Sequence, residues 1–411
     1  MRLRTHLAML LLVTLGPLHA AKADIINDWN EKAVNTVLGR GLGPPPAERV
    51  IAMMHLAIFD AVNSVDGRYK PYLIKLPAGS DTSKEAAAVS AAATILAAVD
   101  PKSADSIKAG LAAELDRIPQ GPARTEGLKL GEAVALNMIQ SRANDGANAP
   151  EAYRPVTTPG VYVPTPPMFV PQWPKVRPFA MTTGDQFRPQ PPVPLDGERW
   201  AADYNEIKAV GRLDSSTRTD DQTQAARFWL STGGDVYYPL VRKVVANSKL
   251  DLLDRARLLA LVAAARADGL IAVFDAKYHY NFWRPITAIR YGDEDGNPAT
   301  ERDATWQPIA DTPMHPEYPC AHCVQAASMC AVLEAVLGSR AIVEVAMTSK
   351  TAPGVTRRWT DLRDFVREVS DARIWAGFHY RFSTEAGAQL GYLVGRHVSD
   401  NLMQPVSVAT R

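Results

Sequence analysis

The stretch that most clearly decides the fold is residues 250–285, LDLLDRARLLALVAAARADGLIAVFDAKYHYNFWRP. Apolar side chains recur along it at helical spacing, and Pro285 marks an end because proline cannot continue a helix. The same pattern returns at residues 320–337, 361–374 and 384–398. Alternation of apolar and polar residues, which indicates strands, is nearly absent. The sequence therefore predicts an all-α protein built from helical bundles.

The first half of the chain is also predicted to be helical, from residue 28 to about residue 141. Residues 150–194 differ, because prolines and aromatic residues are dense there and regular structure cannot persist. The aromatic content favours an ordered loop lying across the helices over a solvated linker. We divide the mature chain into an N-terminal helical region, residues 24–195, which includes this loop, and a C-terminal helical catalytic domain, residues 196–411.

The composition of the chain excludes some classes of function. The 411 residues include 45 Lys and Arg against 44 Asp and Glu, a net charge of +1, which provides no global field for nucleic acid or anionic lipid. With 46% hydrophobic and 22% charged residues, the chain is typical of a globular protein with a large buried core. Its three cysteines all lie between Cys320 and Cys330, so they cannot form a disulfide framework for the fold.

The N-terminus predicts export. Residues 1–23 run from basic to apolar to small residues, which is the order of a signal peptide. Two later apolar stretches, residues 86–99 and 258–274, are too short or too interrupted by charge to span a membrane. We expect a periplasmic or secreted protein without a transmembrane anchor, and we allow for a homo-oligomer.

A pair of cations near the end of the 250–285 helix is the first candidate for chemistry. Lys277 and Arg284 are seven residues apart, which is about two helical turns, so both should project from nearly the same face and clamp one oxyanion. A solvated charged face is the alternative. The aromatic residues between and beside them argue against it, because rings seldom crowd a solvated face.

Two histidines form the second and third candidates. Pro319 suits a helix start, so the amides of Cys320, Ala321 and His322 should point at an anion at the helix N-terminus. Further on, Arg373 precedes His379 by six residues, and Gly377 between them would end the helix and turn the imidazole back. A cap at Ser383 or Thr384 would then start the next helix and leave His379 in the connection.

These three motifs, in this order, resemble the signature of the vanadium-dependent haloperoxidase and type 2 phosphatidic acid phosphatase superfamily. The motifs are Lys277 to Pro285, Pro319 to His322 and Arg373 to His379. The earlier helical half also resembles exported bacterial haloperoxidase-like members. The resemblance implies an all-α fold with vanadate, or phosphate as a substrate, held at one site.

The resemblance also implies roles for individual residues. Lys277, Arg284 and Arg373 would neutralise the equatorial oxygens of the oxyanion. His379 would be the metal ligand on vanadium, or the nucleophile on phosphorus. His322 would be the acid/base at the opposite pole, and Cys320 and Ala321 would contribute amides. Three cations and two imidazoles suit a trigonal-bipyramidal oxyanion.

Residues 320 and 321 depart from the family, which usually has Ser-Gly there. A thiol at Cys320, beside three cations, should have a depressed pKa and react with peroxide. Cys320 and Cys323 form a C-x-x-C pair, which leaves open a disulfide and a redox-enzyme interpretation. A zinc site with His322 is a further alternative, but no fourth ligand is evident.

Three functions remain open from the sequence. The first is a peroxidase in which bound vanadate acts as a Lewis acid on hydrogen peroxide and a halide is oxidised to hypohalous acid. The second is a metal-free acid phosphatase acting on a small phosphomonoester through a phosphohistidine. The third is an inactive anion-binding relative, suggested only by Cys320. We expect the peroxidase.

His315 bears on the choice of halide. Bromide-oxidising members of the family resemble this chain in having histidine at this position, whereas the chloride-oxidising fungal type has phenylalanine. An imidazole there would change its protonation between pH 5 and 8 and tune the activated oxygen. We therefore expect oxidation of bromide or iodide rather than chloride. The alternative is that His315 only caps the loop before Pro316.

Overall fold

The structure is a computed structural model and describes residues 24–164 and 167–406. The predicted signal peptide, residues 1–23, lies outside the described residues. The helices of the first half are α1 (Ile25–Gly39), α2 (Pro44–Asp66), α3 (Lys84–Val99), α4 (Ala104–Leu115) and α5 (Pro122–Ser141), with a short 3-10 helix η1 (Pro101–Ser103). Those of the second half are α6 (Glu198–Val210), α7 (Asp220–Phe228), α8 (Tyr238–Ala246), α9 (Leu252–Tyr280), α10 (Pro285–Arg290), α11 (Ala321–Leu337), α12 (Leu362–Trp375) and α13 (Arg381–Asn401), with a 3-10 helix η3 (Gly234–Val236).

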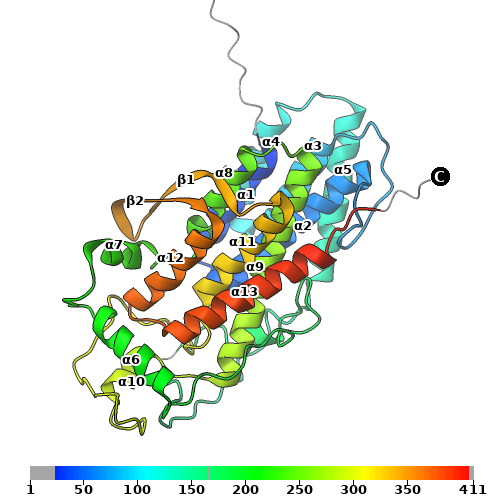
Figure 1. The fold of residues 1–411 in the computed structure, drawn as a ribbon. Helices are drawn as coiled ribbons and strands as arrows, with labels where there is room; N and C mark the ends of the chain where they lie inside the picture. The colour runs from blue at the N-terminus through cyan, green and yellow to red at the C-terminus, as the bar shows by residue number, and fades with distance from the viewer. Residues whose placement is uncertain (1–23, 165–166, 407–411) are drawn as a thin grey trace, which may run out of the picture.

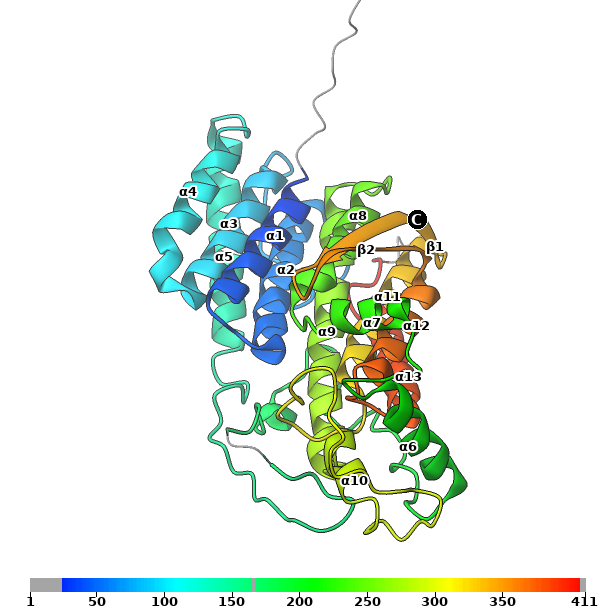
Figure 2. The same ribbon diagram turned by 90° about the vertical axis from the view of Figure 1, so that its left-hand side faces the viewer.

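Helix α9 is the centre of the molecule. Figure 2 shows it running between α1 to α5 on one side and α11 to α13 on the other. Its side chains from Leu258 to Phe274 are buried all round, as expected of a helix that packs against both groups. One core cluster extends from Ile26 to Met403 across both halves, and our division at residues 195 and 196 stays a prediction.

The ends of α9 follow from its capping residues. The side chain of Asp251 accepts a hydrogen bond from the amide of Asp254 at the start. At the other end, Asn281 adopts a left-handed conformation with φ of 49° and stops the helix after Tyr280. Arg284 therefore lies beyond the helix, and the prediction that it shares a helical face with Lys277 was wrong. Pro285 begins α10 instead of ending α9.

Glycines bring pairs of helices unusually close in both halves. On α13, a Cβ atom at Gly387, Gly391 or Gly395 would lie 2.4–2.5 Å from a carbonyl oxygen of Cys320, Val324 or Ser328 in and before α11. On α5, Gly127 and Gly131 approach the carbonyls of Ser83 and Ala87 at α3 in the same manner. The paired residue numbers rise together, so each pair of helices runs parallel.

The proline-rich segment is an ordered loop over the helices, as predicted. Within the described residues of 150–194, the only helix is the 3-10 turn η2 (Trp173–Lys175). The buried carboxylate of Asp268 on α9 accepts hydrogen bonds from three successive amides, those of Phe179, Ala180 and Met181, at 2.6–2.9 Å. Because a buried carboxylate needs such partners, this contact fixes the loop on α9.

The all-α prediction is confirmed, with one addition. An antiparallel hairpin of β1 (Ala341–Ser349) and β2 (Ala352–Asp361) connects α11 to α12 in the chain and lies beside α8 (Figure 1). On β1, Val345, Met347 and Ser349 are buried and their neighbours are exposed. The alternation is too short to stand out in the sequence, which is why it was missed.

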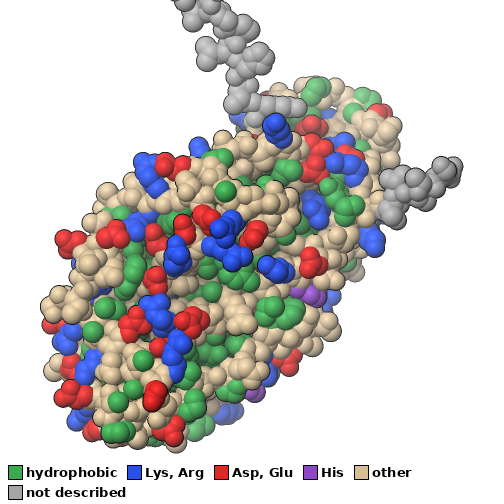
Figure 3. All heavy atoms as spheres, in the orientation of Figure 1, with side chains coloured by type: hydrophobic (Ala, Val, Ile, Leu, Met, Phe, Trp, Pro, Cys, Tyr) green, Lys and Arg blue, Asp and Glu red, His purple; other side chains and the backbone are tan. Residues whose placement is uncertain are grey.

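The surface matches the balanced composition. Figure 3 shows Lys and Arg interspersed with Asp and Glu over the face in view. Among residues 24–164 and 167–406, no helix is long and apolar enough to cross a membrane.

Candidate active site

The three predicted motifs come from separate elements. Lys277 lies near the end of α9, His322 lies in the first turn of α11, and His379 lies in the connection between α12 and α13. Gly377 has φ of 81° and turns the chain after α12, as predicted. The predicted cap was wrong, because Tyr380 precedes the first residue of α13 and Ser383 and Thr384 lie inside the helix.

Lys277 is fully buried, and its ammonium contacts only backbone oxygens. Its Nζ donates hydrogen bonds to the carbonyls of Pro316 and Glu317 at 2.9 and 2.7 Å. Burial, together with the neighbouring Arg284, lowers the pKa of Lys277 well below its usual value. This lysine therefore orders the loop that leads into α11 while carrying an uncompensated charge.

The two arginines are equally buried and also lack a carboxylate partner. Nε of Arg284 donates to the carbonyl of His315 at 2.9 Å, and Nη1 donates to that of Phe378 at 3.0 Å. Nη1 of Arg373 donates to the carbonyl of Trp229, whereas its Nε has no partner in the described part of the chain. Burial lowers the pKa of Arg284 to about 10 and that of Arg373 to about 9.

The positive charge of Lys277, Arg284 and Arg373 favours the binding of an oxyanion between them. Each cation lowers the pKa of another member of the cluster, so the three charges interact electrostatically. Within the described residues, the one buried carboxylate that acts on these cations is Glu317, which leaves an excess of positive charge inside the protein. An uncompensated buried charge costs several kcal/mol. A bound oxyanion would relieve that cost and raise the pKa values again, and the orphaned Nε of Arg373 supplies a donor for it.

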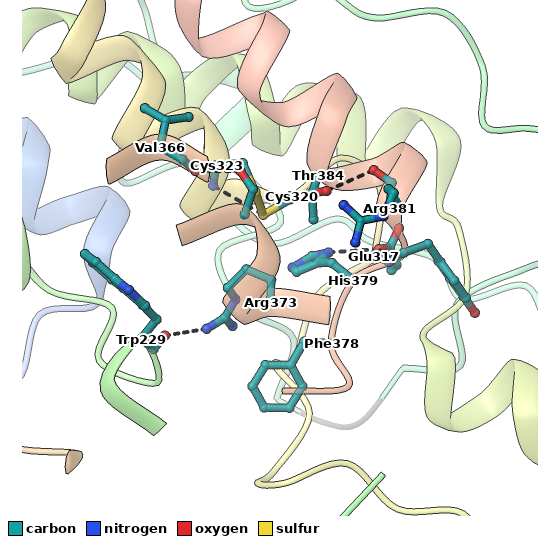
Figure 4. The surroundings of a disulfide bond; sticks show 12 residues. Trp229, Glu317, Cys320, Cys323, Val366, Arg373, Phe378, His379, Arg381 and Thr384 are labelled. Atoms are coloured by element: carbon teal, nitrogen blue, oxygen red, sulfur yellow. Dashed lines mark hydrogen bonds and ion pairs between the residues drawn. A yellow bond between two sulfur atoms is a disulfide. The ribbon is translucent and has the colours of Figure 1, made fainter. Parts of the chain in front are cut away.

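His379 is held by a carboxylate that the sequence analysis did not assign. Its Nδ1 lies 2.9 Å from Oε1 of Glu317, which also accepts the amide of Tyr380 at 3.0 Å (Figure 4). The neutral imidazole therefore donates from Nδ1 and keeps a lone pair on Nε2, which lies 3.4 Å from Nη1 of Arg284. Burial and Arg284 lower the pKa of His379 well below 6.5. Such a lone pair is what a metal ligand requires.

His322 lines a cavity beside this cluster. Its Nε2 lies 3.2 Å from the carbonyl of Ser231, so Nε2 carries the proton and Nδ1 is the basic atom. Burial, with Arg373 next, lowers the pKa of His322 well below 6.5. The amides of Ala321 and His322, in the first turn of α11, have no acceptor among the residues that the structure describes.

Cys320 does not occupy the role expected of it. Its amide donates to the carbonyl of Ser383 at 3.2 Å, so the expectation that this amide points at the anion was wrong. Its sulfur forms a disulfide with Cys323, as Figure 4 shows. The expectation of a reactive thiolate beside the cations was therefore also wrong, because both sulfurs are bonded to each other.

The disulfide argues against the zinc alternative, and the fold argues against the redox-enzyme alternative. Bonded sulfurs cannot ligate zinc, and in the described ranges no group of three or more His, Cys, Asp or Glu residues could hold a metal ion. Nor does a sheet with crossover helices, expected of a thioredoxin-like redox enzyme, occur among the residues described. Cys330 is free and buried, and burial raises its pKa.

His315 lies against Arg284, whose Nη2 is 3.0 Å from Nδ1 of the imidazole. The same Nδ1 lies 3.1 Å from the carbonyl oxygen of Pro316, so this atom accepts from Arg284 or donates to Pro316, but not both at once. Burial, with Arg284 and Lys277, lowers the pKa of His315 well below 6.5. This lowered pKa runs against the prediction that His315 changes its protonation between pH 5 and 8. The imidazole also contacts Phe274, with ring centroids 5.2 Å apart.

Glu317 is the functional residue that sequence reasoning missed. It is followed within three residues by Cys320 in the same loop, but a lone carboxylate carries no spacing signal. Its partner His379 is 62 residues away, so only the tertiary fold reveals the pair. Burial raises the pKa of Glu317 to about 7, and the nearby Lys277 and Arg284 oppose that rise.

Comparisons with known proteins show which sequences and folds this chain resembles. A family model described as the VCPO second helical-bundle domain matches residues 257–407. The vanadium chloroperoxidase of Curvularia inaequalis is 27% identical, and the match covers 72% of this chain. The match spans 62% of the length of that curated relative.

Solved structures show the fold over nearly the whole chain. A bacterial vanadium-dependent iodoperoxidase is 22% identical with a TM-score of 0.79, and the match covers 93% of this chain and 97% of that one. The holo form of a bacterial vanadium-dependent chloroperoxidase is 17% identical with a TM-score of 0.72 and covers 93% of this chain and 96% of that one. The predicted family resemblance and fold are confirmed.

Proposed function

We propose that this chain, which resembles vanadium-dependent haloperoxidases in sequence and fold, uses hydrogen peroxide to oxidise bromide or iodide to hypohalous acid with vanadate as cofactor. The observation that carries the proposal is the set of three buried cations, without salt-bridge partners among the described residues, around the unprotonated Nε2 of His379. We also propose export by residues 1–23 and a periplasmic or secreted location.

The residues present fit an oxyanion of this kind. Lys277, Arg284 and Arg373 would hold its charge, and the Nε2 lone pair of His379 would be the ligand to vanadium. When bound, vanadate would supply a Lewis acid that polarises hydrogen peroxide toward attack by a halide.

The protein's own groups would act around that centre. Glu317 keeps the proton on Nδ1 of His379, so that Nε2 stays unprotonated. His322 would hold or release a proton at Nδ1, since Nε2 is bonded to Ser231. Ala321 offers its amide at the helix N-terminus. Burial of the whole set excludes water and strengthens each electrostatic interaction.

The proposed halide preference rests on His315. Its contact with Arg284 ties one cation of the site to an imidazole dipole that stays neutral. Because one N–H group of Arg284 is directed at His315, Arg284 would stabilise the negative charge of the oxyanion less strongly. A less activated oxygen oxidises iodide and bromide, which lose electrons more readily, before it oxidises chloride.

Two parallel assays test the proposal. The purified protein is incubated with orthovanadate, hydrogen peroxide and iodide, bromide or chloride, and separately with a phosphomonoester without vanadate. We expect iodide and bromide oxidation that depends on vanadate. Phosphomonoester hydrolysis without halide oxidation would replace the proposal by the phosphatase alternative. A His315→Phe variant should gain chloride oxidation relative to bromide, and an unchanged preference would remove His315 from the argument.

A further inference from the structure

The disulfide between Cys320 and Cys323 lies at the first turn of α11, and the proposed reaction gives it no role. Its two cysteines enclose Ala321 and His322, which are the residues of that turn assigned to the oxyanion site. Both cysteines are 0% exposed, and Figure 4 shows His379 in the surroundings of the disulfide. The disulfide is therefore placed where it can control the residues that would bind the oxyanion.

Cys320 is the N-cap residue of α11, and its side chain differs in kind from the other side-chain caps of this protein. Its sulfur accepts a hydrogen bond from the amide of Cys323 at 3.2 Å. Side-chain oxygens of Asp, Ser or Thr cap α1, α3, α7, α9 and α12. Sulfur is a weak acceptor, so this hydrogen bond alone would hold the turn less firmly than a bond to oxygen. The S–S bond joins the same two residues covalently and compensates for the weak cap.

The first turn of α11 needs a firm cap because it lies in a positive environment. The amides of Ala321 and His322 have no acceptor among the residues that the structure describes, and they carry the partial positive charge of a helix N-terminus. Arg373 and Lys277 both act electrostatically on His322. Repulsion between these groups favours an open turn while no anion is bound, and an open turn would no longer present the two amides to an oxyanion.

Helix α13 fixes one end of this turn. The amide of Cys320 donates to the carbonyl of Ser383 at 3.2 Å, and a Cβ atom at Gly387 would lie 2.5 Å from the carbonyl oxygen of Cys320. Cys320 is therefore held against α13, and the disulfide extends this hold to Cys323. Two sulfurs that are not bonded cannot remain at bonding distance, so reduction must move Cys323 and the turn to which it belongs.

We propose that the disulfide between Cys320 and Cys323 is a covalent cap that positions Ala321 and His322 for oxyanion binding, so that the site is complete only in the oxidised chain. The inference rests on the proposed function, which identifies the oxyanion as vanadate. Cys320 and Cys323 are positioning residues, because they act through the two residues between them.

Hydrogen peroxide, a substrate of the proposed reaction, is an oxidant that can close this cap. One thiol attacks the peroxide, the O–O bond breaks, and a sulfenic acid and water form. The second thiol then attacks the sulfenic sulfur, so that the S–S bond forms, the S–O bond breaks and a second water leaves. Two thiols and one peroxide thus give one disulfide and two waters. The sulfurs are oxidised, and the peroxide oxygens are reduced.

The first experiment measures phosphate binding without vanadate or halide. Inorganic phosphate is titrated calorimetrically into oxidised wild type, into wild type reduced with dithiothreitol, and into Cys323→Ala, which lacks the disulfide whether or not the reductant reaches it. A double variant, Cys320→Ser with Cys323→Ala, replaces the covalent cap by a hydroxyl cap. Cys330→Ala is the matched control, because Cys330 is a free buried cysteine further along α11.

We expect reduced wild type and Cys323→Ala to bind phosphate at least about tenfold more weakly than oxidised wild type. The double variant should bind within about threefold of oxidised wild type and should not respond to dithiothreitol. Equimolar hydrogen peroxide should restore the affinity of reduced wild type, and Cys330→Ala should respond as wild type does.

Two results would overturn the inference. One is equal phosphate affinity of oxidised wild type and Cys323→Ala. The other is a double variant that binds as weakly as Cys323→Ala, because the loss would then come from the missing sulfur and not from the missing cap. The proposed function can fail separately. Redox-dependent phosphate binding by a protein that oxidises no halide would support the covalent cap and refute the proposed function, and halide oxidation with redox-independent phosphate binding would do the reverse.

The second experiment follows the turn itself by amide hydrogen exchange. The amide of Val324 donates to the carbonyl of Cys320, so its exchange reports on the first turn of α11. We expect this amide to exchange at least about tenfold faster in Cys323→Ala than in oxidised wild type, and at the wild-type rate in the double variant. Helix α12, capped by Asp361, is the internal control and should not change. Equal exchange at Val324 in all three proteins, or equally faster exchange in α12, would show that the disulfide does not act on this turn.

Discussion

Two buried cations on helix α9 have opposite environments. Arg266 is 1% exposed and lies 2.5 Å from Glu48 of α2, and Tyr237 and Tyr238 cover its guanidinium. Lys277, about three turns further along, is fully buried but has only carbonyls as partners. Burial opposes a rise in the pKa of Arg266, but Glu48, Tyr238 and Tyr237 together raise it, whereas burial lowers the pKa of Lys277.

This difference indicates that the charge of Arg266 serves the fold, whereas the charge of Lys277 is available to a ligand. The Arg266–Glu48 pair balances its own charge and joins α2 to α9, although Nε and Nη1 of Arg266 have no hydrogen-bond partner among the described residues. The cluster of Lys277, Arg284 and Arg373 becomes electrostatically complete only with an anion. Breaking the pair should therefore harm stability, and altering the cluster should harm function.

The largest expected effect is on activity. His379→Ala should lower halide turnover by at least about ten thousandfold, or about 5 kcal/mol, because the only proposed bond from protein to vanadium is lost. The variant should stay folded, as judged by circular dichroism. His279→Ala, an exposed histidine nearby on α9, is the control and should keep its activity. Near wild-type turnover of His379→Ala would disprove the assigned site.

The pair itself is tested by Glu48→Gln. This change leaves Arg266 buried without its counter-charge, which should lower the free energy of unfolding by about 3–5 kcal/mol. Urea unfolding measures it. Phosphate or vanadate should not restore the loss, because the pair is separate from the oxyanion cluster. A loss of less than about 1 kcal/mol in the free energy of unfolding would show that the protein tolerates Arg266 without its counter-charge.

Acid sensitivity should come from the site histidines. The pKa values of His315, His322 and His379 are lowered well below 6.5 in the folded protein, so below pH 6.5 only the unfolded chain takes up their protons. Stability should therefore fall as the pH falls below 6.5, by up to about 1.4 kcal/mol per pH unit for each imidazole.

Urea midpoints at pH 7.5, 6.0 and 5.0 measure this slope. Added phosphate should flatten it, because an anion in the cluster raises the pKa values of the imidazoles in the folded state. A flat profile without phosphate would mean that these histidines are already protonated in the folded protein.

A smaller effect is expected from Glu317→Gln. The amide retains hydrogen bonding but loses the charge that favours the proton on Nδ1 of His379, so vanadate affinity should fall about 10- to 100-fold. Binding is followed by vanadium NMR, a readout that does not need turnover. Glu385→Gln, an exposed carboxylate on α13, is the control. Unchanged affinity would assign Glu317 to the fold alone.

The smallest effect has the opposite sign for stability. Lys277→Met removes an unpaired buried charge while keeping most of the side-chain volume, so it should stabilise the anion-free protein by about 1–3 kcal/mol. The gain from saturating phosphate, about 2.7 kcal/mol at a hundredfold excess over Kd, should shrink. Arg266→Met should destabilise the protein instead. If both changes destabilise it, Lys277 and Arg266 do not differ in the way proposed.

The helices and the proline-rich loop were predictable because each depends on local residue patterns. Residues 320–337 and 361–374 became α11 and α12 within one residue at each end. The end of α9 was not predictable, since Asn281 stops it through a left-handed conformation that several residue types adopt. The hairpin was missed because only three buried positions mark its first strand.

For the candidate site, the sequence indicated which residues to consider but not their partners. Motif order pointed to Arg284 and His379, whose contact at 3.4 Å crosses 95 residues of sequence. The pairs Glu317–His379 and Arg266–Glu48 have no motif at all, and only packing brings them together. For Cys320, the spacing allowed a thiol or a disulfide, and local geometry decided for the disulfide.

The glycine contacts between α13 and α11 set the registration of the two helices. Because backbone meets backbone at three successive turns, α13 cannot slide along α11 without a collision. His322 begins one helix and His379 precedes the other, so their axial offset is set by this contact and not by the chain between them. A longer or shorter hairpin of β1 and β2 should therefore leave the spacing of the two imidazoles unchanged, as long as α12 keeps Arg373 in the cluster.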